Sequence, residues 1–386
     1  METWEAQGHE VAAHHFRNYS SLRMTLAPTW TALVGPNGAG KTNFLELLTV
    51  AIRGVRLRGH LSDLILWGKE VADLHLRLPS GDILETRIER HHTRATRVRS
   101  WNGAVRPVPE TLLPPLILFL PGEDALLDHP QGRRRLLGRG LLMQSVRYHA
   151  VLREYQRLLE QRNALLRGGA ISHASPHTDQ WVSWTTAIIE PLRTIWEERL
   201  RYVAAVNEEL PEVLDRLGGI TLPLHVRLRL GGFGERASVP SAADVEGRFR
   251  ALQGEEVARG ATLVGPHRDH VEVTSDGRDA LPLLSRGQRR ILLLALHIIE
   301  GRVATSLNRP RPLFVFDDVL SELDPEHRAA VRELLKNDQV VLTTADPHIL
   351  TVLSPETHVY TVDHGTVRQV REHATAESPH GARGGQ

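Results

Sequence analysis

The residues from Gly35 to Thr42 have the composition and spacing of a loop that binds phosphate groups. They satisfy the pattern G-x-x-x-x-G-K-[ST] and stand between a strand signal and a helix signal. Glycines let the backbone curl so that successive amide groups point at phosphate oxygens. An ordinary glycine turn is the alternative, but the full pattern predicts a nucleotide site lined by Gly35, Pro36, Asn37, Gly38, Ala39, Gly40, Lys41 and Thr42.

Lys41 and Thr42 would carry the chemistry of this loop. Lys41 would bring a positive charge to the β- and γ-phosphates, and Thr42 would offer its hydroxyl to Mg²⁺. The helix expected after the loop would add its positive dipole end. Of the 47 basic residues only Lys41, Lys69 and Lys336 are lysines, a bias that codon usage or environment explains better than function does.

Two carboxylates follow an apolar segment in the C-terminal part of the chain. Residues 313–316 are apolar, and Asp317 and Asp318 come next. Phosphoryl transfer needs a carboxylate near the metal ion and a group that orients the attacking water. We therefore expect Asp317 to hold Mg²⁺, directly or through water, and Asp318 to polarise the attacking water. The alternative, a buried strand capped by acidic loop residues, is disfavoured by the presence of a phosphate loop.

A third motif, Ser-Arg-Gly-Gln at residues 285–288, precedes an apolar helix signal at residues 291–299. Alone it is weak, because serine is a common helix cap. Its place upstream of the acidic strand, however, resembles the serine-glycine-glutamine signature of ATP-binding-cassette (ABC) ATPases. Residues 321–324, Ser-Glu-Leu-Asp, resemble the D-loop of the same family.

The resemblance to cassette ATPases implies a site shared between two subunits. In that family the signature serine faces the γ-phosphate of ATP bound by the other subunit, so that ATP closes a dimer. By resemblance, the signature residues here are Ser285, Gly287 and Gln288, and the D-loop residues are Ser321 and Asp324. Catalytic roles then fall to Lys41, Asp318 and Ser285, with ATP and Mg²⁺ as cofactors.

Short strands and one helix must position the phosphate loop. Apolar runs at residues 22–34 predict a hairpin or paired strands before the loop, and residues 42–52 have helical spacing. Residues 72–108 alternate as strands do, and residues 101–104, Trp-Asn-Gly-Ala, are a two-residue hairpin turn signal. This section is expected to be antiparallel. Residues before about 12 are expected to form a loose terminus.

A helical section separates the phosphate loop from the signature. Apolar residues recur at intervals of three and four at residues 133–167 and 180–217, which predicts two long antiparallel helices joined by a polar loop at 168–178. Strands resume after Leu222, and residues 261–366 alternate strand and helix as a parallel sheet requires. The predicted fold class is α/β, an ATPase head of mixed sheets with an inserted helical arm.

Several further motifs together resemble the RecF family of bacterial recombination mediators. Lys41 and Ser285 are 244 positions apart, which is long for a transporter subunit and far too short for the coiled coil of a chromosome-structure protein. The matching segments are 16–19 (Phe-Arg-Asn-Tyr), 122–124 with 133–135, 155–157 with 161–166, 265–269 (Gly-Pro-His-Arg-Asp) and 317–324.

The sequence departs from the usual pattern of this family at three places and shares one absence with it. Arg286 stands where glutamine is usual in the signature, residues 12–15 stand where an apolar strand is usual, and His270 replaces a more usual acid. No switch histidine follows Thr344, where residues 345–346 are Ala-Asp. The last absence is ordinary for the family and implies slow hydrolysis, whereas Arg286 affects the detailed signature contact.

The family resemblance implies a DNA repair function. It implies ATP-dependent homodimerisation on duplex, gapped or junction DNA, cooperation with the RecO and RecR mediators, and loading of recombinase at gaps, with roles in replication and the SOS response. It also implies that Arg17 and Asn18 contact the nucleotide. Arg133, Arg134 and Arg135 become candidates for DNA contact, although on charge alone a solvated helix start is the better explanation.

Composition bounds these hypotheses. The chain has 386 residues, 41% of them apolar, enough for a sizeable core. It contains no cysteine, which excludes disulfides, zinc-thiolate sites and thiol catalysis. The longest apolar runs fall far short of the roughly 18 to 20 residues that span a bilayer, and the first ten residues lack the order of an export signal. We expect a cytoplasmic, nucleoid-associated protein without a membrane partner.

The formal net charge of +1 hides an uneven distribution. Residues 87–167 contain 15 arginines against seven acids, so the rest of the chain carries a net −7. Near-neutrality therefore does not argue against a nucleic-acid partner. The arginines at residues 87, 90, 94, 97 and 99 lie in the strand section, where alternation would divide them between two faces.

Other signals are weaker. Residues 267–269, His-Arg-Asp, imitate a protein-kinase catalytic loop, but Thr274 stands where asparagine is required. His9-Glu10 and His14 imitate a zinc protease helix at the wrong spacing, and a metal site other than Mg²⁺ is not expected. Two alternatives to the repair function remain. One is an ATPase subunit that energises a membrane transporter, and the other is a non-hydrolysing scaffold, which the two acids disfavour.

The expected domain organisation follows from these elements. Residues 12–130 would form the N-terminal half of the ATPase lobe, and residues 261–370 would form its C-terminal half. Residues 131–260 would form the inserted helical arm with adjoining strands. Residues 371–386 are rich in Gly, Ala, Ser, Pro and His and are expected to be a disordered tail.

Overall fold

The computed structural model describes residues 8–92, 94–144, 146–168, 179–306, 310–353 and 356–370. The chain divides into two compact units, Met1–Arg106 with Val341–Gln386 (unit 1) and Pro107–Val340 (unit 2). Most of the expected amino-terminal segment and the whole expected tail at 371–386 lie outside the described residues, as does most of the expected polar loop at 168–178. The domain ranges expected from the sequence stay a prediction.

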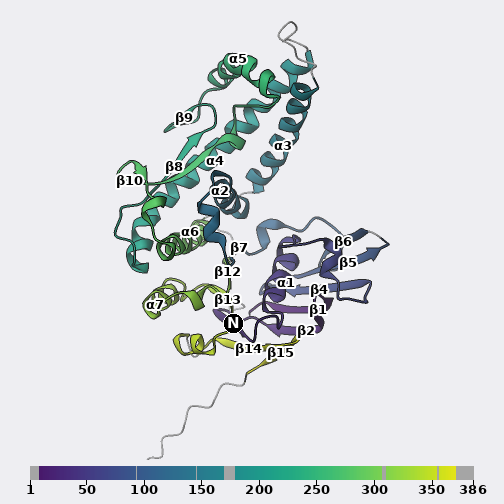
Figure 1. The fold of residues 1–386 in the computed structure, drawn as a ribbon. Coiled ribbons are helices and arrows are strands. Elements are labelled where there is room, and N and C mark those ends of the chain that lie inside the picture. The colour runs from purple at the N-terminus through teal and green to yellow at the C-terminus, as the bar shows by residue number, and fades with distance from the viewer. Residues whose placement is uncertain are drawn as a thin grey trace, which may run out of the picture. The chain divides into compact units, whose positions relative to one another are not determined.

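Unit 1 contains an antiparallel five-stranded sheet in the order β2-β1-β4-β5-β6 (Figure 1). Its strands are β1 (Glu10–Phe16), β2 (Tyr19–Thr25), β4 (Val71–Arg77), β5 (Ile83–His91) and β6 (Arg94–Trp101). The predicted antiparallel section at 72–108 is thus confirmed as far as Trp101. Residues 12–15, Ala-Ala-His-His, lie inside β1, in which Val11, Ala13 and Phe16 are buried.

The second sheet of unit 1 holds the strand that leads into the phosphate loop. It runs in the order β15-β14-β3-β13, from β3 (Trp30–Val34), β13 (Gln339–Thr344, in unit 1 from Val341), β14 (His358–Asp363) and β15 (Thr366–Gln369). β14 lies parallel to β3, and every residue of β3 is buried. The expected pairing within residues 22–34 is wrong, because β2 pairs with β1 and β3 belongs to this other sheet.

Helix α1 (Lys41–Arg53) follows the phosphate loop and contacts β1, β4 and β5 of the five-stranded sheet. Its predicted range, 42–52, is confirmed to within one residue. The turn at residues 102–103 also forms, with Asn102 and Gly103 at φ 51° and 78°. It closes only an isolated bridge between Trp101 and Ala104, so no second long strand follows it.

Unit 2 contains the acidic strand in a parallel pair. β12 (Leu313–Asp317) lies parallel to β7 (Leu116–Phe119), and both strands are wholly buried. The α-helices before and after β12 in the chain are α6 (Arg286–Ser306) and α7 (Pro325–Leu334). Phe119 packs edge-on against Phe316 with ring centroids 6.3 Å apart, which fixes the two strands side by side.

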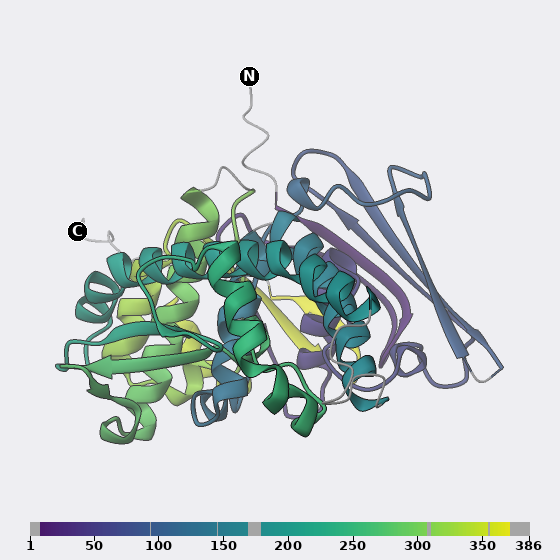
Figure 2. The same ribbon diagram turned by 90° about the horizontal axis from the view of Figure 1, so that it is seen from above.

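The helical section of unit 2 comprises α2 (Pro130–Gln144), α3 (Val146–Arg167), α4 (Asp179–Leu217) and α5 (Ala242–Arg259). α3 lies beside α4 (Figures 1 and 2), and α5 contacts both. The first predicted helix, 133–167, is instead divided between two helices, α2 and α3. Between α3 and α5, Arg162 and Glu256 form a fully buried ion pair at 2.6 Å, with the guanidinium between the rings of Trp181 and Phe249.

A small antiparallel sheet completes unit 2, in the order β11-β10-β8-β9. Its strands are β8 (His225–Leu230), β9 (Gly234–Glu235), β10 (His270–Ser275) and β11 (Arg278–Asp279). The expectation that residues 261–366 alternate towards one parallel sheet is therefore wrong for β10, which pairs with β8 in the antiparallel sense.

Two properties of the described part of the chain concern membranes and metal ions. Among those residues no helix has the length and apolar character that a membrane crossing requires. The same residues contain no cluster of three or more His, Asp and Glu side chains that could hold a metal ion.

Candidate functional site

The phosphate loop connects β3 to α1 through an unusual backbone. Gly38 and Gly40 take φ values of 80° and 119°, which side chains with a Cβ adopt only at a cost. No atom lies within 4 Å of where a Cβ of Gly38 would stand, so this part of the loop faces open space. A Cβ at Gly35 would meet the Val362 carbonyl oxygen at 2.1 Å, so close backbone packing also requires glycine there.

Lys41 and Thr42 are the first residues of α1, as the motif requires. Gly40 caps the helix without a side-chain hydrogen bond. Lys41 is buried, and its Nζ donates to the carbonyl oxygens of Gly35 at 2.7 Å and Pro36 at 3.0 Å. The ammonium group therefore lies over the loop, where the charge of a bound phosphate would draw it.

The hairpin turn between β1 and β2 supports the loop from one side. Asn18 Nδ2 donates to the Ala39 carbonyl oxygen at 3.0 Å, and the Gly365 N–H donates to the same oxygen at 3.1 Å. The Tyr19 hydroxyl donates to the Gly40 carbonyl oxygen at 2.8 Å, and burial raises the pKa of Tyr19, so it remains a donor. These contacts fix the carbonyl oxygens of Ala39 and Gly40.

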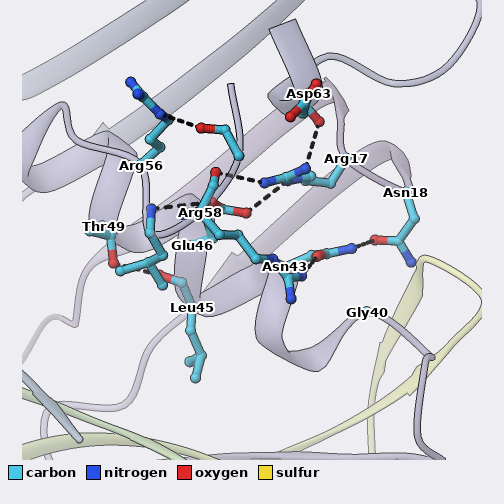
Figure 3. Close-up of polar contacts among 12 residues, drawn as sticks. Arg17, Asn18, Gly40, Asn43, Leu45, Glu46, Thr49, Arg56, Arg58 and Asp63 are labelled. Atoms are coloured by element: carbon cyan, nitrogen blue, oxygen red, sulfur yellow. Dashed lines mark hydrogen bonds and ion pairs between the residues drawn. The ribbon is translucent and has the colours of Figure 1, made fainter. Parts of the chain in front are cut away.

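Arg17 lies in the same turn but serves a different contact (Figure 3). Its φ of 52° is rare for a residue with a side chain. Its Nε donates to Glu46 at 2.7 Å, and its Nη1 donates to the Asp63 carbonyl oxygen at 2.9 Å. Of the two residues expected to contact the nucleotide, Asn18 therefore contacts the phosphate loop itself, and Arg17 holds α1 and the segment after it.

The signature motif begins helix α6 in unit 2. Ser285 Oγ accepts from the Gln288 N–H at 3.2 Å, and Gln288 Oε1 accepts from the Ser285 N–H at 3.0 Å. This reciprocal pair is a capping box, so the serine does have the cap function that its sequence context suggests. Ser285 and Gly287 are nevertheless exposed. Arg286 is 79% exposed and turns towards Asp124 at 3.3 Å.

The acidic pair stands at the end of β12. Asp317 is buried, and Asp318 takes φ 54°, which turns the chain sharply after the strand. Both acids line a small hollow beside the end of β7, and Arg290 of α6 also lines it. The carboxyl end of parallel strands is the usual place for a ligand in an α/β fold.

The D-loop residues stabilise this end of the strand. Ser321 Oγ donates to Asp318 Oδ1. Asp324 caps α7 by accepting from the His327 N–H at 3.0 Å, and this hydrogen bond is the main reason why the pKa of Asp324 is lowered. Glu322 pairs with Arg290 of the signature helix. The D-loop and the signature helix are therefore in direct contact within one subunit.

Two of the three arginines considered for DNA contact point into unit 2. Arg133 donates to the carbonyl oxygens of Val271 at 2.6 Å and Leu127 at 2.5 Å. Arg134 donates to the Asp269 carbonyl oxygen at 2.8 Å. Arg135 is exposed. DNA contact stays a prediction for this triplet, and the structure leaves only Arg135 fully available for it.

The Gly-Pro-His-Arg-Asp segment at 265–269 is an internal joint. The Asp269 carboxylate accepts from Trp196 Nε1 at 2.9 Å, Arg199 Nη1 at 2.6 Å and the Gly231 N–H at 2.8 Å. Asp269 is buried, and desolvation raises its pKa in spite of these donors. It connects α4 to the β8–β9 loop, which is incompatible with the role of a kinase catalytic base.

The geometry fits a nucleoside triphosphate and Mg²⁺. The glycine-built curve of the loop, its open face at Gly38 and the position of Lys41 suit a polyphosphate. Thr42, the second residue of α1, offers a hard oxygen ligand, and Mg²⁺ commonly takes one or two protein ligands beside phosphate oxygens and water. ATP would supply the phosphoanhydride bond that is hydrolysed. Its γ-phosphate would be the group by which the protein distinguishes ATP from ADP.

Three supporting residues were not predicted. Asn43, Glu46 and Gly365 hold the phosphate loop or its neighbouring turn through hydrogen bonds to residues distant in the sequence. Their spacing follows no known motif. Only the position of Asn43, directly after Thr42, was a signal that could have been used.

Comparison with known proteins gives consistent results. No protein-family model matches the chain. The chain is 32% identical over 344 residues to the DNA replication and repair protein RecF of Moorella thermoacetica, covering 87% of this chain and 89% of that protein. It is 34% identical over 354 residues to the protein of the same name from Frankia alni, covering 86% and 90%.

Solved structures show the same fold. A structure of the recombination mediator protein RecF-ATP in the RecFOR pathway superposes with a TM-score of 0.81 at 19% identity, covering 96% of this chain and 99% of that one. An Smc head bound to the C-winged helix domain of ScpA superposes with a TM-score of 0.53 at 15% identity, covering 94% and 96%. The predicted fold class, an ABC-type ATPase head, is confirmed.

Proposed function

Because the chain belongs to the RecF family of DNA replication and repair proteins, we propose that it is an ATP-dependent DNA-binding protein of recombinational repair. Such a protein acts in the cytoplasm on nucleoid DNA, and its family membership leaves the transporter alternative without support. The observation that carries the proposal is the phosphate loop, whose backbone, lysine and supporting turn have the geometry a triphosphate requires.

In this proposal ATP is a switch between monomer and homodimer. Lys41 and the loop amides bind the phosphates of one ATP, and the exposed motif at Ser285 and Gly287 of a second subunit covers the γ-phosphate. Each site is then complete only in the dimer, so the affinity between subunits depends on ATP. The dimer closes on gapped or junction DNA and helps to load recombinase.

Hydrolysis reopens the dimer in the proposed cycle. Thr42 and Asp317 are the Mg²⁺ ligands, and Asp318 polarises the attacking water. Hydrolysis is slow, because no switch histidine follows Thr344 and the Asp346 side chain instead accepts from the His348 N–H at 2.9 Å. RecO and RecR, which share the pathway named for the solved relative, are the expected protein partners.

Light scattering tests the switch directly. The molar mass of the wild type is measured with and without ATP-Mg²⁺ and with gapped DNA. Lys41→Met is expected to abolish ATP binding and the dimer, because the phosphates lose their charge partner. Ser285→Arg is expected to leave ATP bound by monomers, because the new side chain blocks the facing subunit.

A nucleotide-binding measurement and a control variant make the light-scattering result specific. A fluorescent ATP analogue shows separately whether each variant binds nucleotide, so a folding defect is not mistaken for a lost dimer. Arg286→Gln, which restores the residue usual in the family beside an unchanged Ser285, is the matched control and should dimerise as the wild type does. Equal dimerisation of Ser285→Arg and the wild type would rule out the shared site.

A further inference from the structure

Unit 1 carries an open hollow lined by three arginines. It lies between the segment that follows α1, residues 54–61, and strand β6, and its basic residues are Arg56, Arg58 and Arg97. No acid is among the described residues that line it. We call this feature the basic hollow. Its position is distinct from the phosphate loop, which stands at the opposite end of α1.

Arg97 has no counter-charge in the described part of the chain. Burial lowers its pKa first of all, and the positive charge of Arg56 lowers it further. Its neighbour Arg99, which faces the same side of β6, is by contrast engaged with the carbonyl oxygens of Ala51 at 2.8 Å and Ile52 at 2.9 Å. Arg99 thus stabilises the end of α1, whereas Arg56 and Arg97 repel each other.

Like charges held together in this way favour an anion. An added anionic ligand would relieve the repulsion, and guanidinium groups bind phosphate oxygens in a bidentate manner. Residues 53–60 contain Arg53, Arg56, Arg58 and His60 and no acid, so the basic character extends beyond the hollow itself. Aliphatic residues also line the hollow, at positions 50, 55, 57, 61 and 64, but its charged groups are all basic, which suits the anionic phosphate backbone of a nucleic acid.

A chain of hydrogen bonds connects the basic hollow to the phosphate loop, and Figure 3 shows its part from Arg58 through Asn43 to Asn18. Arg58 Nη2 donates to Asn43 Oδ1 at 2.9 Å, Asn43 Nδ2 donates to Asn18 Oδ1 at 2.8 Å, and Asn18 Nδ2 donates to the Ala39 carbonyl oxygen at 3.0 Å. Movement of the loop on binding phosphates would therefore be transmitted to Arg58.

A buried carboxylate fixes the backbone of the hollow. Glu46 Oε1 accepts from the N–H groups of Leu57 at 3.2 Å and Arg58 at 3.3 Å, while its Oε2 accepts from Arg17 at 2.7 Å. Glu46 belongs to α1, and its side chain is wholly buried. The segment at 56–58 is thus held by α1 and by the turn that also supports the phosphate loop.

We propose that the basic hollow binds the phosphodiester backbone of DNA and that the Arg58–Asn43–Asn18 chain couples its occupancy to the phosphate loop. Arg56 and Arg97 supply the phosphate contacts, and Arg58 supplies the connection. The contact carries no base recognition, so it is independent of sequence. This inference rests on the proposed function, because it requires that the protein binds DNA in an ATP-dependent manner.

Fluorescence anisotropy with a labelled gapped duplex tests the contact. The double variant Arg56→Gln/Arg97→Gln is expected to weaken binding by about tenfold or more, and to reduce the slope of log affinity against log salt by about two, one for each phosphate contact. Arg94→Gln is the matched control, because Arg94 is an exposed arginine on the other face of β6. Arg97→Lys keeps the charge and should retain the salt slope.

The coupling is tested with Asn43→Ala. This variant should bind DNA without ATP as the wild type does, but the change in DNA affinity on adding ATP should be lost. By reciprocity, DNA should no longer change the affinity for a fluorescent ATP analogue. Measuring the analogue without DNA shows that the variant still binds nucleotide.

The anisotropy measurements distinguish failure of the proposed function from failure of the DNA contact or of the coupling. If the wild type does not bind DNA at any salt concentration, the proposed function fails. If the wild type binds but the double variant keeps its salt slope, the contact in the basic hollow is overturned. Competition by polyglutamate as strong as competition by unlabelled DNA would make an acidic protein the ligand instead. Full ATP dependence in Asn43→Ala, or none in the wild type, would overturn the coupling.

Discussion

Asp318 combines a strained backbone with a polar partner. Its φ of 54° is sparsely populated, and such residues cluster at functional sites. Ser321 Oγ donates to its Oδ1, which orients the carboxylate at the end of β12. Asparagine tolerates this backbone conformation and has nearly the same size as aspartate, so the substitution removes the charge with little effect on the fold.

Asp318→Asn is therefore expected to slow ATP turnover by about 100-fold or more, the usual contribution of a general base. ATP-bound dimers should persist, which light scattering after removal of free ATP would detect. Ser321→Ala, which keeps the carboxylate and loses only its orientation, should have a smaller effect. Undiminished turnover in Asp318→Asn would remove this residue from the catalytic step.

For single residues, the sequence shows which side chains are charged but not which groups they contact. Gly38, Lys41 and Asp317 have the positions that their motifs require, because the motif itself encodes the local backbone. No motif distinguishes the role of Arg133 from that of Arg97. A guanidinium that donates to the Val271 carbonyl oxygen and one that faces Arg56 look the same in a sequence, since their partners are distant along the chain.

The joint formed by residues 265–269 has a pH-sensitive member. His267 Nδ1 accepts from the Tyr155 hydroxyl at 2.6 Å, and its Nε2 donates to the Thr262 carbonyl oxygen at 3.0 Å, which is the pattern of a neutral ring. Burial lowers the pKa of His267 to about 4 from 6.5, with smaller contributions from nearby arginines. The folded protein therefore keeps this ring neutral at pH values where the unfolded chain protonates it.

The free energy of unfolding is expected to fall as the pH decreases from about 6.5 to about 4, because the unfolded state then binds one more proton. The full loss is roughly 3 kcal/mol, and no further loss from this group occurs below its folded pKa. Urea unfolding at several pH values measures it. His267→Gln should show a shallower dependence over this range, whereas His270→Gln, at an exposed histidine three residues further along the chain, should match the wild type.

At the element scale, prediction succeeded where a local pattern determines the structure. Helix α1 and strands β4 to β6 follow directly from periodicity and from a loop motif that ends in a helix. Pairing partners were harder. β2 and β3 are adjacent in the sequence but join different sheets, and β10 pairs with β8, because long-range burial rather than sequence proximity selects the partner.

For the whole molecule, the uneven charge does not translate directly into a binding surface. Residues 87–167 carry most of the arginine surplus, but several of these side chains are engaged within the fold. Arg162 pairs with Glu256 in the interior, Arg139 pairs with Glu123 at 2.6 Å, and Arg134 donates to a carbonyl oxygen. The electrostatic footprint for DNA is therefore local, as at the basic hollow, and smaller than a count of arginines indicates.

The proposed assembly makes a prediction that only mixed dimers can test. If one subunit supplies the phosphate loop and the other the signature, Lys41→Met and Ser285→Arg damage opposite halves of each site. Either variant alone should stay monomeric with ATP. An equimolar mixture should form some dimer, because a heterodimer of the two has one intact site, made from the loop of the Ser285→Arg chain and the signature of the Lys41→Met chain.

The matched control carries the same two substitutions on one chain. A heterodimer of the wild type with Lys41→Met/Ser285→Arg has no intact site, since each of its two sites lacks either the loop lysine or the signature serine. Differently tagged chains and affinity capture with ATP distinguish the two mixtures. Capture of the first pair above the second shows that ATP is held between subunits. Capture of the second pair equal to or above capture of the first contradicts the shared site, because a site built within one chain would be intact only in the wild-type chain of the second pair.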